Sequence, residues 1–267
     1  MVDINAINAV LGNITVLNTL NDKYIVKAQN KKYIIWQAAN PILIDLVLNY
    51  EYTPKIIYHK EFIIAEWLEN SCYGQIDELE PKIISSLHKL AENKISNAWL
   101  EPIDKMWNKL PNTLKIDIKN QYMDWPSYKS KLIIPNTGNL CHCDLHPGNI
   151  LIKDNKYYLI DLEWLNIAPK EFDLAMLKQF MDANKFQKFL DGYDLPFNNE
   201  LLEQYYKLCL YRCGLWALDK SSTSNIPKNI EVPDINVFRQ QLINNTFSGD
   251  KYDYLLLGIS ALFSSGL

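Results

Sequence analysis

The sequence L-C-H-C-D-L-H-P-G-N-I-L, residues 140–151, is the most informative segment of this chain. Apolar runs typical of strands precede it at residues 132–134 and follow it at residues 150–152 and 157–160. The last two runs are joined by D-N-K, a composition that favours a tight turn and so predicts a hairpin. The second strand of this hairpin runs into D-L-E-W, residues 161–164. The segment therefore predicts a polar loop, a β-hairpin and an acidic residue at a strand exit.

Asp144, Asn149 and Asp161 are the candidate catalytic residues of this segment. Phosphoryl transfer needs a carboxylate beside the attacking hydroxyl and oxygen ligands for the Mg²⁺ that carries the nucleotide phosphates. In kinases, an Asp and an Asn five residues apart on one loop supply the carboxylate and one metal ligand. We expect Asp144 to position or deprotonate a hydroxyl. We expect Asn149 and Asp161 to hold magnesium.

Three motifs here resemble those of the aminoglycoside phosphotransferase and choline kinase superfamily. Residues 142–151, HCDLHPGNIL, resemble its catalytic loop, which usually reads H-G-D-L-H-P-G-N-I-L. Residues 160–164, IDLEW, are similar to the I-D-W-E-Y or I-D-F-E-Y of choline-kinase-like and thiamine-kinase-like members, and residues 171–175, EFDLA, to the F-D-L-A that follows. The resemblance implies an α+β, two-lobed protein-kinase-like fold with a small β-rich N-lobe and a larger, mostly helical C-lobe.

The elements expected before this segment fit such an N-lobe. We expect strands near residues 14–17, 24–29, 32–37, 55–58 and 61–67, with helices through residues 3–11 and 41–49. Residues 1–69 are assigned to a nucleotide-binding N-lobe, and residues 70–267 to a C-lobe with the catalytic loop and substrate-binding helices. Late helices are expected over residues 200–220, 235–245 and 252–263. The resemblance implies that Glu66, Trp67 and Leu68 form a hinge that binds the base of ATP or GTP.

The N-lobe departs from the kinase pattern at Trp36, which stands where a phosphate-clamping Lys or Arg is expected on the third strand. If Asn30 and Lys31 form a two-residue turn, Lys27 lies opposite Ile34, on the face shared with Trp36, and its ammonium reaches the phosphates. The alternative is that Lys27 is an exposed hairpin lysine. Two further alternatives are catalysis by the metals alone and a non-catalytic binding protein on the same fold.

The acceptor that the resemblance implies is a small hydroxyl compound, often cationic. Ammonium groups bind over aromatic faces, with about 0.5–2 kcal/mol per contact, and Trp164, Tyr211 and Trp216 are the candidates, with core packing as the alternative for each. Glu163 would orient the cation or assist a metal, unless it is a salt-bridged loop residue. The IDLEW motif favours a choline, ethanolamine or thiamine type of acceptor over an aminoglycoside. A phosphotransferase acting on a protein or a sugar is a further alternative.

Several neighbouring polar residues have structural interpretations. His142 and His146 are expected to support the catalytic loop, and the resemblance gives Asp173 the same task, with a helix N-cap as its alternative. A zinc cluster of Cys141, His142, Cys143 and His146 is a competing interpretation. Structural zinc sites usually combine two separated ligand pairs, and the sequence offers no second pair nearby.

The composition excludes several classes of protein. Of the 267 residues 48% are apolar, whereas 22% are charged with a net charge of −4, which argues against disorder and against nucleic-acid binding. Five cysteines and a start without Lys or Arg before Lys23 predict a cytoplasmic protein with reduced thiols. No run of 18 apolar residues occurs, so no membrane span is expected. The expected partners are a nucleotide and a small-molecule acceptor.

Overall fold

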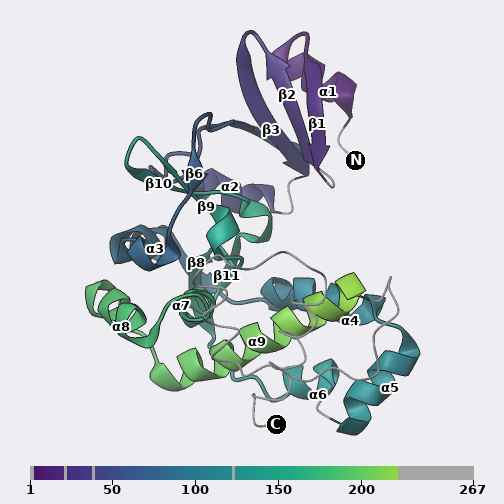
Figure 1. Cartoon of the computed structure of the whole chain (residues 1–267), viewed down its shortest axis with the longest axis vertical. Helices are drawn as coiled ribbons and strands as arrows, with labels where there is room; N and C mark the ends of the chain where they lie inside the picture. The colour runs from purple at the N-terminus through teal and green to yellow at the C-terminus, as the bar shows by residue number, and fades with distance from the viewer. Residues whose placement is uncertain (1–2, 21–22, 38–39, 122–123, 222–267) are drawn as a thin grey trace.

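The computed structural model describes residues 3–20, 23–37, 40–121 and 124–221 of the chain. A small N-terminal part is built on an antiparallel sheet, and a larger C-terminal part consists mostly of helices (Figure 1). This arrangement confirms the predicted α+β class. The helices expected over residues 235–245 and 252–263 lie outside the described residues. No helix in the described part of the chain is long and apolar enough to cross a membrane.

The N-terminal sheet has five strands in the order β1-β2-β3-β5-β4, all antiparallel to their neighbours. Their bounds are β1 (Thr15–Leu20), β2 (Lys23–Ala28), β3 (Lys31–Gln37), β4 (Ile56–His59) and β5 (Phe62–Glu66). Helix α1 (Ile4–Leu11) begins at Asp3, whose side chain accepts the amide of Asn5 as an N-cap. Helix α2 (Pro41–Val47) follows β3. A small core that includes Ile7 packs between α1 and the sheet.

The β2–β3 hairpin turns at Gln29 and Asn30, both with positive φ, 47° and 67°. The register pairs Lys27 with Lys32. The prediction that Lys27 lies opposite Ile34 is therefore wrong, because the turn begins one residue earlier than expected. The two registers differ by two residues and keep the same side chains on each face, so a period-two apolar pattern cannot distinguish them.

The C-terminal part combines helices with two small sheets, ordered β10-β9-β6 and β11-β8-β7. Its strands are β6 (Cys72–Tyr73), β7 (Glu92–Lys94), β8 (Thr137–Cys141), β9 (Ile150–Lys153), β10 (Lys156–Leu159) and β11 (Asn166–Ala168). Its helices are α3 (Pro81–Lys89), α4 (Glu101–Lys109), α5 (Asn112–Gln121), α6 (Trp125–Lys129), α7 (Lys170–Lys178), α8 (Ala183–Gly192) and α9 (Asn199–Ser221). The short 3-10 turns are η1 (Ile76–Glu78), η2 (Asn97–Leu100), η3 (Pro147–Asn149) and η4 (Leu162–Trp164).

The catalytic segment folds largely as its sequence predicts. Strands β9 and β10 form the expected hairpin, with positive φ at Asp154 and Asn155 in the turn. Residues 132–134 are irregular rather than a strand, and β8 begins later, at Thr137. Helix α7 is buried from Glu171 to Leu177, which places it at the centre of the main core, beneath the catalytic loop.

Candidate functional site

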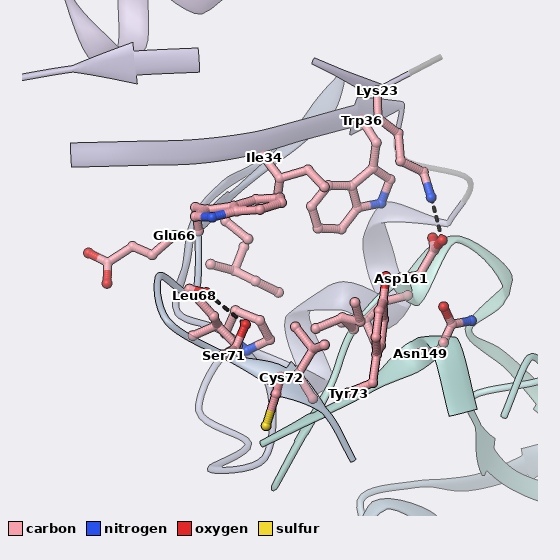
Figure 2. A pocket seen from close by; sticks show the side chains of 18 residues that line it. Lys23, Ile34, Trp36, Glu66, Leu68, Ser71, Cys72, Tyr73, Asn149 and Asp161 are labelled. Carbon is pink, nitrogen blue, oxygen red and sulfur yellow. Dashed lines mark hydrogen bonds and ion pairs between the residues drawn. The ribbon is translucent and has the colours of Figure 1, made fainter. Parts of the chain in front are cut away.

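A pocket of about 440 Å³ lies between the N-terminal sheet and the β9–β10 hairpin, a size typical of small-ligand sites (Figure 2). Apolar side chains from both parts of the chain form most of its wall, namely Ile34, Trp36, Pro54, Ile56, Ala65, Leu151, Ile160 and Leu162. Three of its polar residues, Lys23, Asn149 and Asp161, approach one another at one side. The pocket therefore offers an apolar slot next to a charged end.

The predicted hinge, residues 66–68, lines this pocket. The amide N–H groups of Glu66 and Trp67 donate to the carbonyl oxygens of Lys55 and Lys32, at 2.9 and 3.0 Å. Within the described residues, the Leu68 amide has no such partner. Of the three residues of the predicted hinge, Leu68 is therefore the one whose N–H is left to donate to the edge of a planar base.

The catalytic loop holds Asp144 through two neighbours. Asn149 donates through Nδ2 to the backbone oxygen of Asp144, at 2.9 Å, and to its Oδ2, at 3.1 Å. Arg212, from α9, donates through Nη2 to Asp144 Oδ1 at 2.6 Å and through Nη1 to Cys143 O at 3.2 Å. The Arg212 and Asp144 side chains are only 13% and 17% exposed. Burial by itself raises the pKa of Asp144. The nearby Arg212 guanidinium and His146 lower it by more than burial raises it, so this pKa lies below its ordinary value.

Asp161 lies two residues after the end of β10 and adopts a left-handed conformation, with φ 61°. Its Oδ2 accepts a hydrogen bond from Lys23 Nζ, and the Glu163 carboxylate lies 3.4 Å from the same ammonium. Asp161 Oδ1 is buried and has no hydrogen-bond partner among the described residues. Carboxylate and amide oxygens are the ligands that Mg²⁺ prefers, so Asp161 and the nearby Asn149 fit the predicted metal site.

Asp173 braces the loop from helix α7. Its Oδ2 accepts the His142 amide at 2.8 Å and His88 Nε2 at 3.1 Å, while Oδ1 accepts the Cys143 amide at 2.8 Å. His88 Nδ1 hydrogen-bonds the Tyr193 hydroxyl at 2.6 Å, which extends the network to the end of α8. Cys143 has φ 62°, in the region that favours glycine, and the resembled loop has glycine at this place. The Asp173 carboxylate thus fixes a strained turn that directly precedes Asp144.

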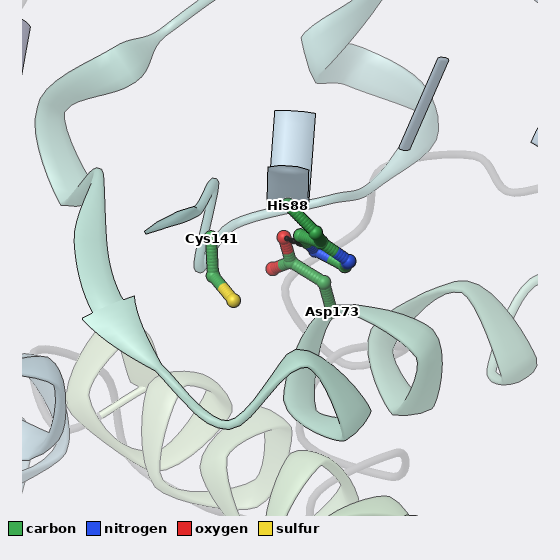
Figure 3. A group of neighbouring side chains, drawn as sticks. All are labelled: His88, Cys141 and Asp173. Atoms are coloured by element: carbon green, nitrogen blue, oxygen red, sulfur yellow. Dashed lines mark hydrogen bonds and ion pairs between the residues drawn. The ribbon is translucent and has the colours of Figure 1, made fainter. Parts of the chain in front are cut away.

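His88, Cys141 and Asp173 are the only set of three or more potential metal ligands that the described residues bring together (Figure 3). Both Asp173 oxygens already accept hydrogen bonds from backbone amides, so Asp173 in this set supports the loop structurally. The described structure does not bring together the alternative zinc ligands, Cys141, His142, Cys143 and His146. The His142 Nε2 atom instead hydrogen-bonds Ile160 O at 2.8 Å. His146 supports the loop locally, where its Nδ1 accepts the Gly148 amide at 3.1 Å.

The four residues that were predicted to bind the phosphoryl acceptor have different surroundings. Glu163 lies beside Lys23, at the charged end of the pocket. Trp164 is half-buried and packs against the main core. Tyr211 is fully buried and stacks on Tyr128 with 5.0 Å between ring centroids, so the core-packing alternative holds and its prediction as an acceptor residue is wrong. Trp216 lies in α9, but its side chain is outside the described part.

Sequence reasoning missed Lys23 and Arg212. Lys27 is exposed and does not line the pocket, because it lies four residues further along β2, about 13 Å from Lys23. The available signal for Lys23 was the hairpin register, which sets it across from Trp36. Arg212 is one of two arginines in a chain that otherwise uses lysine, and a guanidinium suits a buried pair with a carboxylate.

Comparisons with known proteins agree with this geometry. Residues 96–203 match the model of the Phosphotransferase enzyme family. A search of curated protein sequences finds no match. Among solved structures, the choline kinase LicA from Streptococcus pneumoniae has a TM-score of 0.60 at 19% identity, covering 91% of this chain and 97% of that chain.

Two other solved structures are similar to this chain. A choline/ethanolamine kinase family protein from Mesorhizobium loti gives a TM-score of 0.54 at 14% identity, covering 96% of both chains. Spectinomycin phosphotransferase, solved with ADP and spectinomycin, gives 0.52 at 16% identity, covering 98% of this chain and 97% of that one. Residues 96–203 therefore resemble the Phosphotransferase enzyme family, and the chain as a whole is similar in fold to choline kinases and to an aminoglycoside phosphotransferase.

Proposed function

We propose that this protein is a small-molecule kinase. It transfers the γ-phosphoryl group of ATP or GTP to a hydroxyl of a small cationic amino alcohol of the choline, ethanolamine or thiamine type. The observation that carries the proposal is the meeting of Asn149 and Asp161 at the charged end of a pocket whose other end is the hinge. Asp144 is hydrogen-bonded to Asn149 and so lies beside that end. These residues are the set that phosphoryl transfer needs.

Asp144 acts mainly by orientation in this proposal. Its carboxylate is ionised at neutral pH and fixed between Arg212 and Asn149, so it can accept a hydrogen bond from the acceptor hydroxyl. A loose transition state for phosphoryl transfer asks for little base strength, so a lowered pKa is compatible with this role. Magnesium bound by Asn149 and Asp161 would neutralise charge on the transferring phosphoryl group.

The nucleotide base is assigned to the apolar end of the pocket. Ile34 and Ala65 from the sheet and Leu151 from β9 line it from two sides, which suits a flat heteroaromatic ring. The Leu68 amide then supplies a donor to the ring edge. Solved relatives with AMP and with ADP support an adenine nucleotide, though GTP shares the same phosphates.

The amino alcohol is favoured as acceptor by the likeness to choline and ethanolamine kinases. The choline kinase structure has the higher TM-score, 0.60 against 0.52 for spectinomycin phosphotransferase. An aminoglycoside is the second candidate because that phosphotransferase covers nearly the whole chain. The non-catalytic alternative relies on Trp36, and the intact Asp144, Asn149 and Asp161 argue against it.

The test is phosphoryl transfer from ATP or GTP with Mg²⁺ to a panel of choline, ethanolamine, thiamine and aminoglycosides. We expect turnover with one amino alcohol, and a loss of about 100-fold or more in Asp144→Ala. Asp191→Ala, an exposed site on α8, is the matched control and should keep full activity. Survival of Asp144→Ala turnover within about tenfold would refute the role of Asp144. No turnover with any acceptor, together with no nucleotide-induced thermal shift, would favour a protein without kinase activity.

A further inference from the structure

Lys23 and Trp36 occupy facing positions on neighbouring strands. The register of β2 and β3 pairs Tyr24 with Ile35, and one more step along the same ladder sets Lys23 opposite Trp36. Side chains at facing positions of an antiparallel pair lie on the same side of the sheet, with Cβ atoms about 4.5–5.5 Å apart. Both residues line the pocket (Figure 2). The β3 position where kinases carry a phosphate-binding cation therefore holds Trp36, and Lys23 lies directly opposite it on β2.

The Lys23 ammonium is already at the charged end of the pocket. It hydrogen-bonds Asp161 and lies 3.4 Å from Glu163, and its side chain is only 20% exposed. An ammonium has three donors, so it can keep Glu163 while donating to another anion. Lys23 thus stands next to the proposed metal ligand Asp161, where the phosphates of a bound nucleotide would lie.

Trp36 contributes a second donor. Its side chain is 6% exposed, and the indole Nε1 is buried without a hydrogen-bond partner among the described residues. In Figure 2 the indole nitrogen points toward the side of the pocket that holds Lys23 and Asp161. A buried N–H group without a partner costs about 1–3 kcal/mol, so each such group in a native protein calls for an explanation, such as a functional role, a bound ion or a water molecule.

We propose that Lys23 and Trp36 together replace the β3 cation as the phosphate clamp of this protein. The Lys23 ammonium pairs with phosphate oxygens, the Trp36 indole N–H donates to one of them, and Lys23 releases Asp161 to the metal. The inference rests on the proposed nucleotide-dependent function and concerns the same pocket. The competing explanation is that Lys23 only latches the two parts of the chain together and that Trp36 is only a core residue.

The experiment measures binding of Mg·ATP and of AMP by titration calorimetry. AMP has the base and one phosphate but lacks the outer phosphates that the clamp would hold. We expect Lys23→Met to weaken Mg·ATP binding about tenfold or more while AMP binding changes by less than about threefold. Lys27→Met is the matched control, since Lys27 lies on the same strand face but outside the pocket, and it should bind both nucleotides as the parent does.

Two further variants address Trp36. Trp36→Phe keeps an aromatic ring but loses the N–H, and we expect about a threefold to tenfold loss for Mg·ATP with little change for AMP. The double variant Lys23→Met/Trp36→Lys restores a cation on β3 and should recover part of the lost Mg·ATP affinity. Nearly unchanged AMP binding by Lys23→Met shows that this single variant is folded.

Each outcome decides between the explanations. If Lys23→Met binds Mg·ATP within about twofold of the parent, the clamp is refuted while nucleotide binding stands. Equal losses for Mg·ATP and AMP would also refute it, because they would show that Lys23 organises the pocket as a whole. If the parent protein binds neither ATP nor GTP, the proposed function itself fails, and the clamp fails with it.

Discussion

Replacing Arg212 by methionine should destabilise the protein, and more strongly at neutral than at acidic pH. The guanidinium is the ionic partner of Asp144, and both side chains are largely buried. Breaking a buried pair by removing one partner typically costs 3–5 kcal/mol. Because both side chains keep some contact with water and Asn149 still donates to Asp144, we expect about 3 kcal/mol. For a chain of this size that loss corresponds to roughly 6–12 °C in Tm.

The pH dependence follows from the pKa of Asp144. In the parent protein that pKa lies below its ordinary value, because Arg212 outweighs burial. A carboxyl with a lowered folded-state pKa adds stability above its unfolded pKa, and this stability is lost as the pH falls through the folded-state value. In Arg212→Met, burial acts without the guanidinium, so the pKa of Asp144 rises and the group takes up a proton at higher pH. The gap in unfolding free energy should therefore be widest near pH 7 and narrow toward about pH 4.

The assay is urea unfolding of the parent and the variant at about pH 7.5 and about pH 4. Lys178→Met is the matched control, because Lys178 pairs with the exposed Glu203 between the same helices, α7 and α9. A surface pair of this kind should cost about 1 kcal/mol or less. A double-mutant cycle with Asp144→Asn should give a favourable coupling of about 1–3 kcal/mol between the two side chains. A loss below about 0.5 kcal/mol, or an equal loss at both pH values, would refute an electrostatic role for Arg212.

Two further predictions test the pocket and its support. Cys72 is exposed and lines the pocket, whereas burial raises the pKa of the other thiols, that of Cys213 to about 11. Alkylation should therefore reach Cys72 first, and Mg·ATP should slow it about fivefold or more by mass spectrometry; no protection would contradict the assignment of this pocket to the nucleotide. In Asp173→Asn, the new side-chain amide places a donor against a buried backbone N–H. The free energy of unfolding in urea should therefore fall by about 2–3 kcal/mol, whereas the exposed control Asp191→Asn should lower it by less than about 0.5 kcal/mol.

The catalytic segment was predictable because its contacts are local. Asp144 and Asn149 lie on one short loop and hydrogen-bond each other across five residues. The β9–β10 hairpin is set by its own turn residues, and it delivers Asp161 to the pocket. Local spacing and turn chemistry therefore predict the positions of Asp144, Asn149 and Asp161 without knowledge of the rest of the fold.

The two cations were not predictable in this way. Lys23 meets Asp161 across 138 residues of sequence, and Arg212 meets Asp144 across 68. Such pairs depend on how distant elements pack, which no local pattern encodes. The same limit applies to Tyr211, since an aromatic residue on a helix can either line a site or fill a core, and only the packed fold shows which.

If Lys23 and Trp36 form the proposed clamp, Trp36 in place of the β3 cation does not mark a loss of kinase activity. What a phosphate clamp needs is a cation at one point in space, and a residue across an antiparallel ladder reaches that point as well as one on β3 itself. Two buried groups near that point, the Trp36 indole N–H and Asp161 Oδ1, have no partner among the described residues, and each unsatisfied group lowers stability. A protein that used the fold only as a scaffold would gain stability by satisfying or removing them, so their retention favours a pocket that is completed by a phosphate and a metal ion.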